Sequence, residues 1–362
     1  MLWLFLIIST LSWGIAEIYY KKGNIANEKY SHLKSTCFVG LFMGVYALII
    51  LLTQNINYNP INILIYLPVS LCYIISMTCS YFGVRFIEES ISDPIENTAG
   101  AIVPVLCAIF MHEKIGIWQI IAIVVVVIGI LGVGFVENNG TTALSKRLGK
   151  KLAVLAFAMP FCYALLDATG TFLDIFYTDD AATSILKGVT EDNLEHMANC
   201  SYEFTFFIIS IGILIFLKIK HVKLFSLDSE PTQAKKAAIV SPDACGNAVC
   251  ATMEQTENSL GATSAADGNN ADATNSAPLK WYQKVLLQKD KLLAAFFETI
   301  GQATYIFALS EGKGIAAVIL GAGTVIVSLT LSRIILKEKL TKLQYLFILI
   351  ILAGIIFLSL VE

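Results

Sequence analysis

The sequence predicts an all-α polytopic membrane protein whose ten transmembrane helices form two inverted five-helix repeats. The first observation is composition: 56% of the 362 residues are hydrophobic, only 15% are charged, and the mean hydropathy is +0.70. Soluble domains carry about 25% charged residues, so this composition is typical of a membrane protein. The second observation is a series of ten long apolar stretches, and the third is a membrane hairpin that occurs twice.

The ten apolar stretches cover residues 2–20, 33–53, 61–84, 91–111, 117–136, 149–172, 201–219, 290–309, 314–335 and 343–361. Each has about the 20 residues that a helix needs to cross the hydrocarbon core. No basic segment precedes the first stretch, so we expect it to be a retained helix and not a cleaved signal peptide.

Two polar regions organise the chain into repeats. Residues 137–147 separate a first repeat, 1–136, from a second repeat, 149–361. The second repeat contains an acidic loop at 177–199 and a linker at 224–280 that is rich in Ala, Ser, Thr, Asn and Asp. This linker has no hydrophobic period, which predicts disorder.

The hairpin at residues 96–135 returns at 321–360 with a constant offset of 225. The offset places Glu113 on Glu338, Lys114 on Lys339, Gln119 on Gln344 and Gly129 on Gly354. An offset of 150 relates the starts of the repeats, with Trp13 on Tyr163, Gly14 on Ala164 and Glu17 on Asp167. Since five spans is an odd number, the second repeat must enter the membrane from the opposite side. A substrate site is then expected between the repeats near the bilayer midplane.

The basic residues predict an orientation. The connectors after the odd-numbered spans hold most of them: Lys21, Lys22, Lys29, Lys34, Arg85, Lys146, Arg147, Lys150, Lys218, Lys220, Lys223, Lys337, Lys339 and Lys342. The opposite connectors hold only Lys114, Lys187 and Lys313. The positive-inside rule puts the richer side in the cytoplasm and both termini outside, in a multi-pass protein of the plasma membrane.

The paired hairpins resemble the drug/metabolite transporter superfamily, in particular its EamA-type ten-helix carriers. The residues that carry the resemblance are Pro104, Glu113-Lys114, Gln119 and Gly129 in the first repeat, Glu338-Lys339, Gln344 and Gly354 in the second, and Trp13-Gly14 followed by Lys21 and Lys22. The departures are Leu329, where a second proline might be expected, and the long linker. The resemblance implies transport of an amino acid, sugar, drug or other metabolite. Members of this family often have both termini in the cytoplasm, whereas the distribution of Lys and Arg in this sequence predicts that both are outside.

Three acidic residues inside apolar spans are candidates for substrate binding or proton coupling. They are Glu17, Asp167 and Glu298, and an ionisable group in a span costs about 2.5–3.5 kcal/mol. Polar neighbours at helical spacing extend the candidate set to Trp13, Tyr163, Asp174, Gln302 and Tyr305. The Ala16-Glu17 pair also resembles the first-helix glutamate of small multidrug pumps, which binds protons and cationic substrates. The structural alternatives are pairing of Glu17 with Lys21 and hydrogen bonding between helices.

The fourth and ninth spans leave two interpretations open. Asp93, Asn97, Gly100 and Pro104 share one face of the fourth span, beside Glu96. This face either lines a cavity, with Asn97 as a site residue, or forms the polar first turn of the helix. The stripe Gly321, Thr324, Ser328 and Ser332 favours close helix packing. Glu113 and Glu338 are expected to be structural, capping the helices that follow or pairing with neighbouring lysines.

The soluble-enzyme motifs are absent from the sequence: there is no P-loop, no H-E-x-x-H and no G-x-S-x-G. Cys245 and Cys250 have no second pair beside them and no nearby histidine, so no metal site is expected. We therefore expect no enzyme activity and no cofactor. The expected partners are a small-molecule substrate and the lipid bilayer, without nucleic acid, for a monomer or homodimer.

These features predict a secondary transporter that moves a small polar or amphipathic metabolite across the cytoplasmic membrane by alternating access, with proton coupling as an open option. One alternative is a flippase for a lipid-linked sugar. Two others are an intramembrane enzyme, for which no nucleophile–base pair stands at suitable spacing, and a non-transporting scaffold that uses the linker and the acidic loop.

Overall fold

The structure is a computed structural model that describes residues 1–54, 56–135, 149–226, 281–338 and 341–361. Within these ranges the chain is helical and contains no β-sheet. The predicted disorder of 224–280 falls almost entirely outside the described residues. Only residues 224–226 of that linker can be compared with the prediction.

The helices follow the predicted spans closely. They are α1 (Leu2–Gly23), α2 (Ser31–Thr53), α3 (Ile61–Ile65), α4 (Leu67–Gly83), α5 (Glu89–Glu96), α6 (Ala99–Phe110), α7 (Ile117–Phe135), α9 (Lys150–Thr178), α10 (Leu194–Ile219), α13 (Trp281–Leu286), α14 (Lys289–Leu331), the π-helical η2 (Ser332–Leu336) and α15 (Lys342–Val361). By length and apolar composition, six helical segments of the described chain could each cross a membrane. The count of ten spans remains a prediction.

The structure divides two of the predicted spans and places two others in one element. The third span is divided at Tyr66, and the fourth is divided at Asn97 and Thr98 into α5 and α6. The eighth and ninth spans form one element, α14, which breaks at Lys313, where φ is 45° and ψ is −133°. The acidic loop is shorter than expected, because α9 extends to Thr178 and α10 already begins at Leu194.

The repeated Glu-Lys connectors have the same backbone turn. His112 and Lys337, which are 225 residues apart, both adopt left-handed φ values, 55° and 59°. The next residue of each connector donates its backbone N–H to the end of the preceding helix: Glu113 to the Cys107 carbonyl and Glu338 to the Ser332 carbonyl, at 3.4 and 3.3 Å. These acceptors are themselves 225 residues apart, so the duplication extends to individual hydrogen bonds.

The repeated glutamines start the following helices in the same way. Gln119 accepts a hydrogen bond from the backbone N–H of Gly116 at 2.7 Å, and Gln344 accepts one from that of Thr341 at 2.6 Å. Each glutamine stands three residues after the residue that precedes its helix, which is the spacing of a capping box. The glutamines therefore cap α7 and α15, which was one of the two roles expected of Glu113 and Glu338.

The two connector glutamates instead reach the other half of the chain. Both carboxylate oxygens of Glu338 accept hydrogen bonds from the first turn of α5, from the N–H groups of Glu89 at 3.2 Å and Ser90 at 3.1 Å. Glu113 lies 3.6 Å from the ammonium of Lys313, at the break in α14. The expectation that Glu338 caps the helix after it is thus wrong, whereas Glu113 does pair with a lysine.

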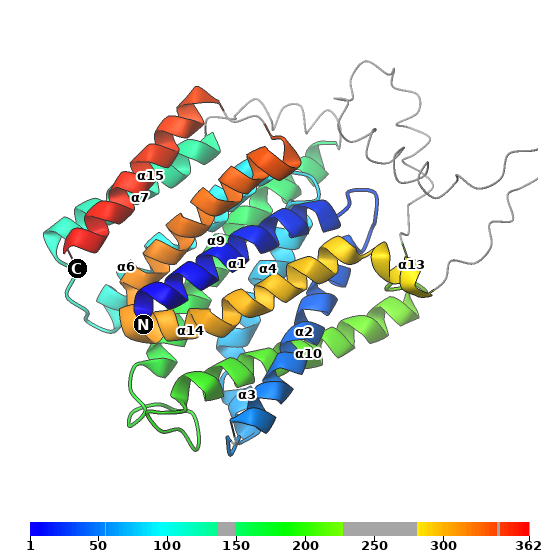
Figure 1. Ribbon diagram of the computed structural model, residues 1–362, viewed down its shortest axis with the longest axis horizontal. Coiled ribbons are helices and arrows are strands. Elements are labelled where there is room, and N and C mark those ends of the chain that lie inside the picture. The colour runs from blue at the N-terminus through cyan, green and yellow to red at the C-terminus, as the bar shows by residue number, and fades with distance from the viewer. Residues whose placement is uncertain (55, 136–148, 227–280, 339–340, 362) are drawn as a thin grey trace, which may run out of the picture.

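The most extensive helix pairings join the two halves of the sequence. They are α1 with α14, α4 with α9, α2 with α10, α7 with α15, and α6 with α14. Figure 1 shows α7 beside α15 and α1 beside α14. Each pair combines one helix from before residue 136 with one from after residue 149, so the core lies between the halves.

Two glycines related by the 225 offset allow α7 and α15 to pack at backbone distance. A Cβ atom on Gly129 would lie 2.6 Å from a side-chain carbon of Ile351, and one on Gly354 would lie 2.7 Å from a side-chain carbon of Val126. Val126 and Ile351 are also 225 residues apart. The same pair of contacts therefore occurs twice across this interface.

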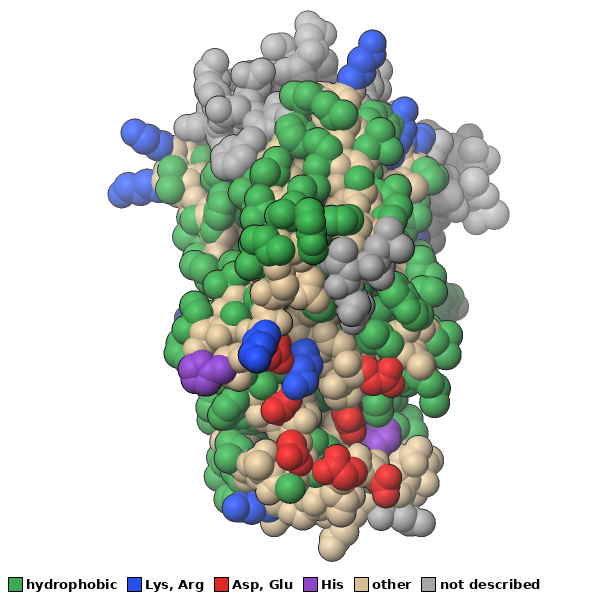
Figure 2. Space-filling model, turned by 90° about the vertical axis from the view of Figure 1, so that its left-hand side faces the viewer, with side chains coloured by type: hydrophobic (Ala, Val, Ile, Leu, Met, Phe, Trp, Pro, Cys, Tyr) green, Lys and Arg blue, Asp and Glu red, His purple; other side chains and the backbone are tan. Residues whose placement is uncertain are grey.

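Acidic side chains gather toward one end of the molecule. In Figure 2, Asp and Glu side chains lie in the lower half with Lys and Arg side chains beside them, the upper edge carries Lys and Arg, and much of the surface between is hydrophobic. We call the end with Glu28, Lys34 and Arg85 the basic end. The other end, with Asp179 and Lys313 in an ion pair of 2.5 Å, we call the acidic end.

Candidate functional site

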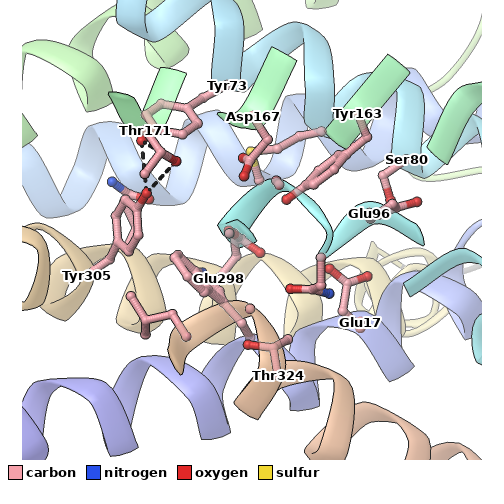
Figure 3. Close-up of a pocket in the computed structure, with 18 of the residues that line it drawn as sticks. Glu17, Tyr73, Ser80, Glu96, Tyr163, Asp167, Thr171, Glu298, Tyr305 and Thr324 are labelled. Atoms are coloured by element: carbon pink, nitrogen blue, oxygen red, sulfur yellow. Dashed lines mark hydrogen bonds between the residues drawn. The ribbon is translucent and has the colours of Figure 1, made fainter. Parts of the chain in front are cut away.

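A cavity lies between the two halves, with about 810 Å³ of space between the atoms that line it. Its walls come from α1, α4, α5, α6, α9, α10 and α14 (Figure 3). The carboxylates in the lining are Glu17, Glu96, Asp167 and Glu298, and the aromatic residues are Trp13, Tyr20, Tyr73, Tyr81, Tyr163, Tyr202 and Tyr305. Each half of the chain supplies two of the four carboxylates.

The three acidic residues singled out in the sequence face this cavity from three helices. Glu17 comes from α1, Asp167 from α9 and Glu298 from α14. Glu298 accepts a hydrogen bond from the Tyr20 hydroxyl at 3.2 Å. The Oε2 atom of Glu17 is buried and has no hydrogen-bond partner. Lys21, the alternative partner of Glu17, donates to the backbone carbonyls of Val84 and Ile87.

Tyr305 connects several helices at one side of the cavity. Its hydroxyl lies 2.7 Å from the Thr171 hydroxyl and 3.0 Å from the Tyr73 hydroxyl (Figure 3). Its ring lies 4.8 Å from that of Trp13, between centroids. Because these hydroxyls bond each other, the rings are held in place and present their faces as fixed walls.

The cavity has no fixed positive charge in the described chain. None of its lining residues is a lysine, an arginine or a histidine, although four are acidic. Ionised carboxylates that are buried away from water require a partner, and otherwise they take up protons. The arrangement is therefore suited to binding cations or protons, and it disfavours anions.

A comparison with protein families identifies the fold that carries this cavity. The model of the EamA-like transporter family matches residues 1–135 and 274–360, more than half of the sequence. The chain belongs to the EamA-like transporter family. It is therefore a membrane protein of the drug/metabolite transporter type, and its relatives at the family level are transporters and not enzymes.

Other comparisons bear on the fold alone. No curated protein matches this EamA-like transporter. A solved crystal structure, described only as that of a protein, is similar over 98% of this chain and 99% of its own, with a TM-score of 0.52 and 8% sequence identity. At that identity the likeness extends to the arrangement of helices and not to a substrate.

The structure brings eight of the nine sequence-predicted site residues to the cavity of this EamA-like transporter. They are Trp13, Glu17, Asn97, Tyr163, Asp167, Glu298, Gln302 and Tyr305. The ninth, Asp174, is buried outside the lining, where its carboxylate accepts hydrogen bonds from Tyr66 and, at 3.3 Å, from Tyr73. Asp174 therefore supports Tyr73 from behind the cavity wall. The Tyr73 hydroxyl also donates to the Thr171 hydroxyl at 3.2 Å.

Sequence reasoning missed the residues that α4 and α10 contribute to the EamA-like transporter's cavity. Tyr73, Ser80 and Tyr81 come from α4, and Tyr202 comes from α10. None of these four residues carries a charge, so the free-energy cost of a charged group in a membrane span did not single them out. The available signal was the number of serines and tyrosines in the third span, which is polar for a stretch exposed to lipid.

Groups of three or more potential metal ligands are absent from the residues that the structure describes. The four carboxylates around the cavity come from four different helices, α1, α5, α9 and α14.

Proposed function

We propose that this EamA-like transporter is a secondary carrier that exchanges a small organic cation for protons by alternating access across the cytoplasmic membrane. The observation that carries the proposal is the central cavity, with four carboxylates and no basic side chain in its lining. A neutral metabolite would not need four carboxylates, and an anion would be repelled by them. A bound cation would supply the positive charge that the cavity lining lacks.

The aromatic residues favour an organic cation over a metal ion. Trp13 and Tyr305 form a rigid corner, and rings of this kind attract ammonium groups by about 0.5–2 kcal/mol each. The cavity lining also includes the apolar side chains of Met77, Ala317 and Leu320. The substrate class is therefore an ammonium compound with an apolar body.

Protons are the natural counter-substrate for such a site. After the cation leaves, the buried carboxylates regain neutrality by binding protons. Glu17 is the first candidate for this exchange, because its Oε2 atom has no hydrogen-bond partner. Asp167, its counterpart in the second repeat, and Glu298 complete the acidic set. The cation and the protons would then compete for the same oxygens, which couples their movements.

Alternating access is supported by the relation between the halves. The most extensive helix pairings cross from one half to the other, and the Glu-Lys connectors match in turn geometry and in hydrogen bonds. With five spans in each of two repeats, 1–136 and 149–361, the second repeat has inverted topology. Rocking of one repeat against the other would expose the shared cavity to each side in turn.

Proton release from the purified protein in detergent tests the proposal. Choline and tetraethylammonium are the probes, and 3,3-dimethylbutan-1-ol is a neutral control with the shape of choline. We expect release with at least one cation and none with the alcohol. Glu17→Gln, Asp167→Asn and Glu298→Gln should each reduce it, whereas Glu203→Gln, at a buried glutamate of α10 that does not line the cavity, should not. Equal signals from choline and the alcohol, or no release with either cation, would refute the proposal.

A further inference from the structure

The short helix α5 carries a row of acidic residues away from the cavity. Glu89, Asp93 and Glu96 are spaced by four and three residues, so they share one face of the helix. All eight residues of α5 are buried. Glu96 lines the cavity, while Glu89 begins the helix toward the basic end, next to the connector that holds Glu338. The row therefore links the cavity to that connector.

Glu89 differs from the other two acids in having no structural role that would explain it. Asp93 accepts hydrogen bonds from Ser328 and from Asn97, the latter at 2.8 Å, and Glu96 accepts one from Ser92 at 2.7 Å. Glu89 is 1% exposed, and neither of its carboxyl oxygens has a hydrogen-bond partner. Glu203 on α10 is buried in the same way, so burial alone does not assign a role. What distinguishes Glu89 is its place in a row of acids that reaches from the cavity to Glu338.

The ionisable groups around Glu89 lie on both sides of it along the row. Glu89 has electrostatic interactions with Asp93 and Glu96 on α5, with Lys21 on α1, and with Glu338 in the connector before α15. Glu17 precedes Lys21 by about one turn of α1, and Lys21 bonds the backbone at Val84 and Ile87, just before α5. Asp167 on α9 acts on Glu96, at the cavity end. Glu89 thus lies at the end of α5 that is near Lys21 and Glu338, and Glu17 lines the cavity about one turn before Lys21 on α1.

Glu338 provides the outer end of this line. Its carboxylate is only partly buried, and it is fixed by hydrogen bonds from the backbone N–H groups of Glu89 and Ser90. Lys21 donates to the carbonyls of Val84 and Ile87 just before α5, so a positive charge stands beside the line. A positive charge at this point favours a transient negative charge on Glu89.

We propose that Glu89 relays the coupling proton between Glu17 in the cavity and Glu338 at the basic end. In each transfer one carboxyl O–H bond breaks and one forms on the next carboxylate, and the negative charge moves one step in the opposite direction. No oxidant or reductant takes part. The inference rests on the proposed exchange of cations for protons. It adds that the protons travel along α5, by a route that the substrate does not use.

A separate proton route can be interrupted without stopping the movement of substrate. In proteoliposomes, exchange of radiolabelled choline for unlabelled choline at equal pH needs no net proton transfer. Net choline efflux does need it, and a pH dye in the lumen would report the protons that enter. Choline has a fixed charge, so it carries no proton of its own. For Glu89→Gln we expect choline exchange within about twofold of wild type and a choline-driven proton flux reduced by about 100-fold or more.

Matched variants make the result decisive. Glu203→Gln replaces another fully buried glutamate without hydrogen-bond partners, on α10 and outside the row, and should leave both signals unchanged. Glu89→Asp should restore part of the proton flux. A proton flux of Glu89→Gln within about twofold of wild type would overturn the relay. So would equal loss of exchange and proton flux in a well-folded variant. The same measurements are made with tetraethylammonium, which also has a fixed charge. Absence of exchange of both cations in wild type would instead refute the proposed function, on which the relay rests.

Discussion

Replacing Glu28 by glutamine removes the anion that two buried lysines share at the basic end. Glu28 Oε1 lies 2.6 Å from the Lys34 ammonium, and Oε2 lies 3.0 Å from that of Lys291. The three residues are at most 2% exposed. Glu28 lies between α1 and α2, whereas Lys291 belongs to α14, so the cluster joins the first half of the chain to the second. The substitution Glu28→Gln keeps the shape of the side chain, removes its charge and replaces one acceptor oxygen by an NH2 donor.

Removing one partner of a buried ion pair costs about 3–5 kcal/mol, because the other charge remains buried. The lower end applies to Glu28→Gln. Lys34 keeps a hydrogen bond to the Ser226 carbonyl at 2.5 Å, and Lys291 keeps one to the Gln288 side chain at 2.8 Å. We therefore expect a loss of about 3 kcal/mol in the free energy of unfolding. The melting temperature should fall on the order of 5 °C.

A thiol-reactive fluorogenic dye can follow this unfolding in detergent, since Cys37, Cys107 and Cys200 are buried free thiols. The control is Glu311→Gln, which removes a partly exposed acid 3.9 Å from the N-terminal amine and should cost less than about 1 kcal/mol. If Glu28→Gln melts no lower than Glu311→Gln, the ion cluster contributes nothing to stability and the reasoning is wrong.

The same pair of proteins should show a defined pH dependence. Burial alone would raise the pKa of the Glu28 carboxyl, but the Lys291 charge and the hydrogen bonds from Lys34 and Ser31 outweigh it and lower the pKa. A lowered pKa in the folded state adds stability above the unfolded value of about 4.3, and this is lost as the pH falls through the folded value. The gap between wild type and Glu28→Gln should thus be constant near neutral pH and shrink below about pH 4.

Two further predictions concern packing and the cavity wall. Gly129→Ala should lower stability by about 1–3 kcal/mol in the melting assay, because its new methyl group meets Ile351. Gly212→Ala, with no atom within 4 Å of the new Cβ, should be neutral or stabilising, and equal effects of the two would contradict the close packing. Tyr305→Phe should cost about 1 kcal/mol, because it removes the hydroxyl that bonds Thr171 and Tyr73. No loss on melting would show that those bonds are not formed.

The sequence predicted the spans and the connectors because both depend on local patterns. Apolar stretches mark helices by length, and the 225 offset predicted that Gln119 and Gln344 are equivalent, as their matching hydrogen bonds confirm. Glu17, Asp167 and Glu298 could be identified by the cost of an acid in an apolar span. Such reasoning needs no knowledge of what a helix packs against.

Contacts between distant residues were beyond the reach of these patterns. The hydrogen bond from the Glu89 backbone to Glu338 joins residues 249 positions apart, and that between Tyr73 and Tyr305 joins residues 232 apart. Glu89 escaped notice for a further reason. The predicted fourth span begins at residue 91, so this glutamate fell in a connector, where an acid has no cost. Only the packing around α5 buries it.

The pairing of helices across the halves has a consequence for biosynthesis. When α1 enters the membrane, its partner α14 has not been made, because α14 begins at Lys289 and α1 ends at Gly23. The same delay holds for α2, α4 and α7, whose partners all follow residue 149. The first half must therefore remain inserted but incompletely assembled until translation of the second half is nearly complete. Two fragments divided between residues 136 and 149 should each be unstable alone and should form the native assembly when synthesised together.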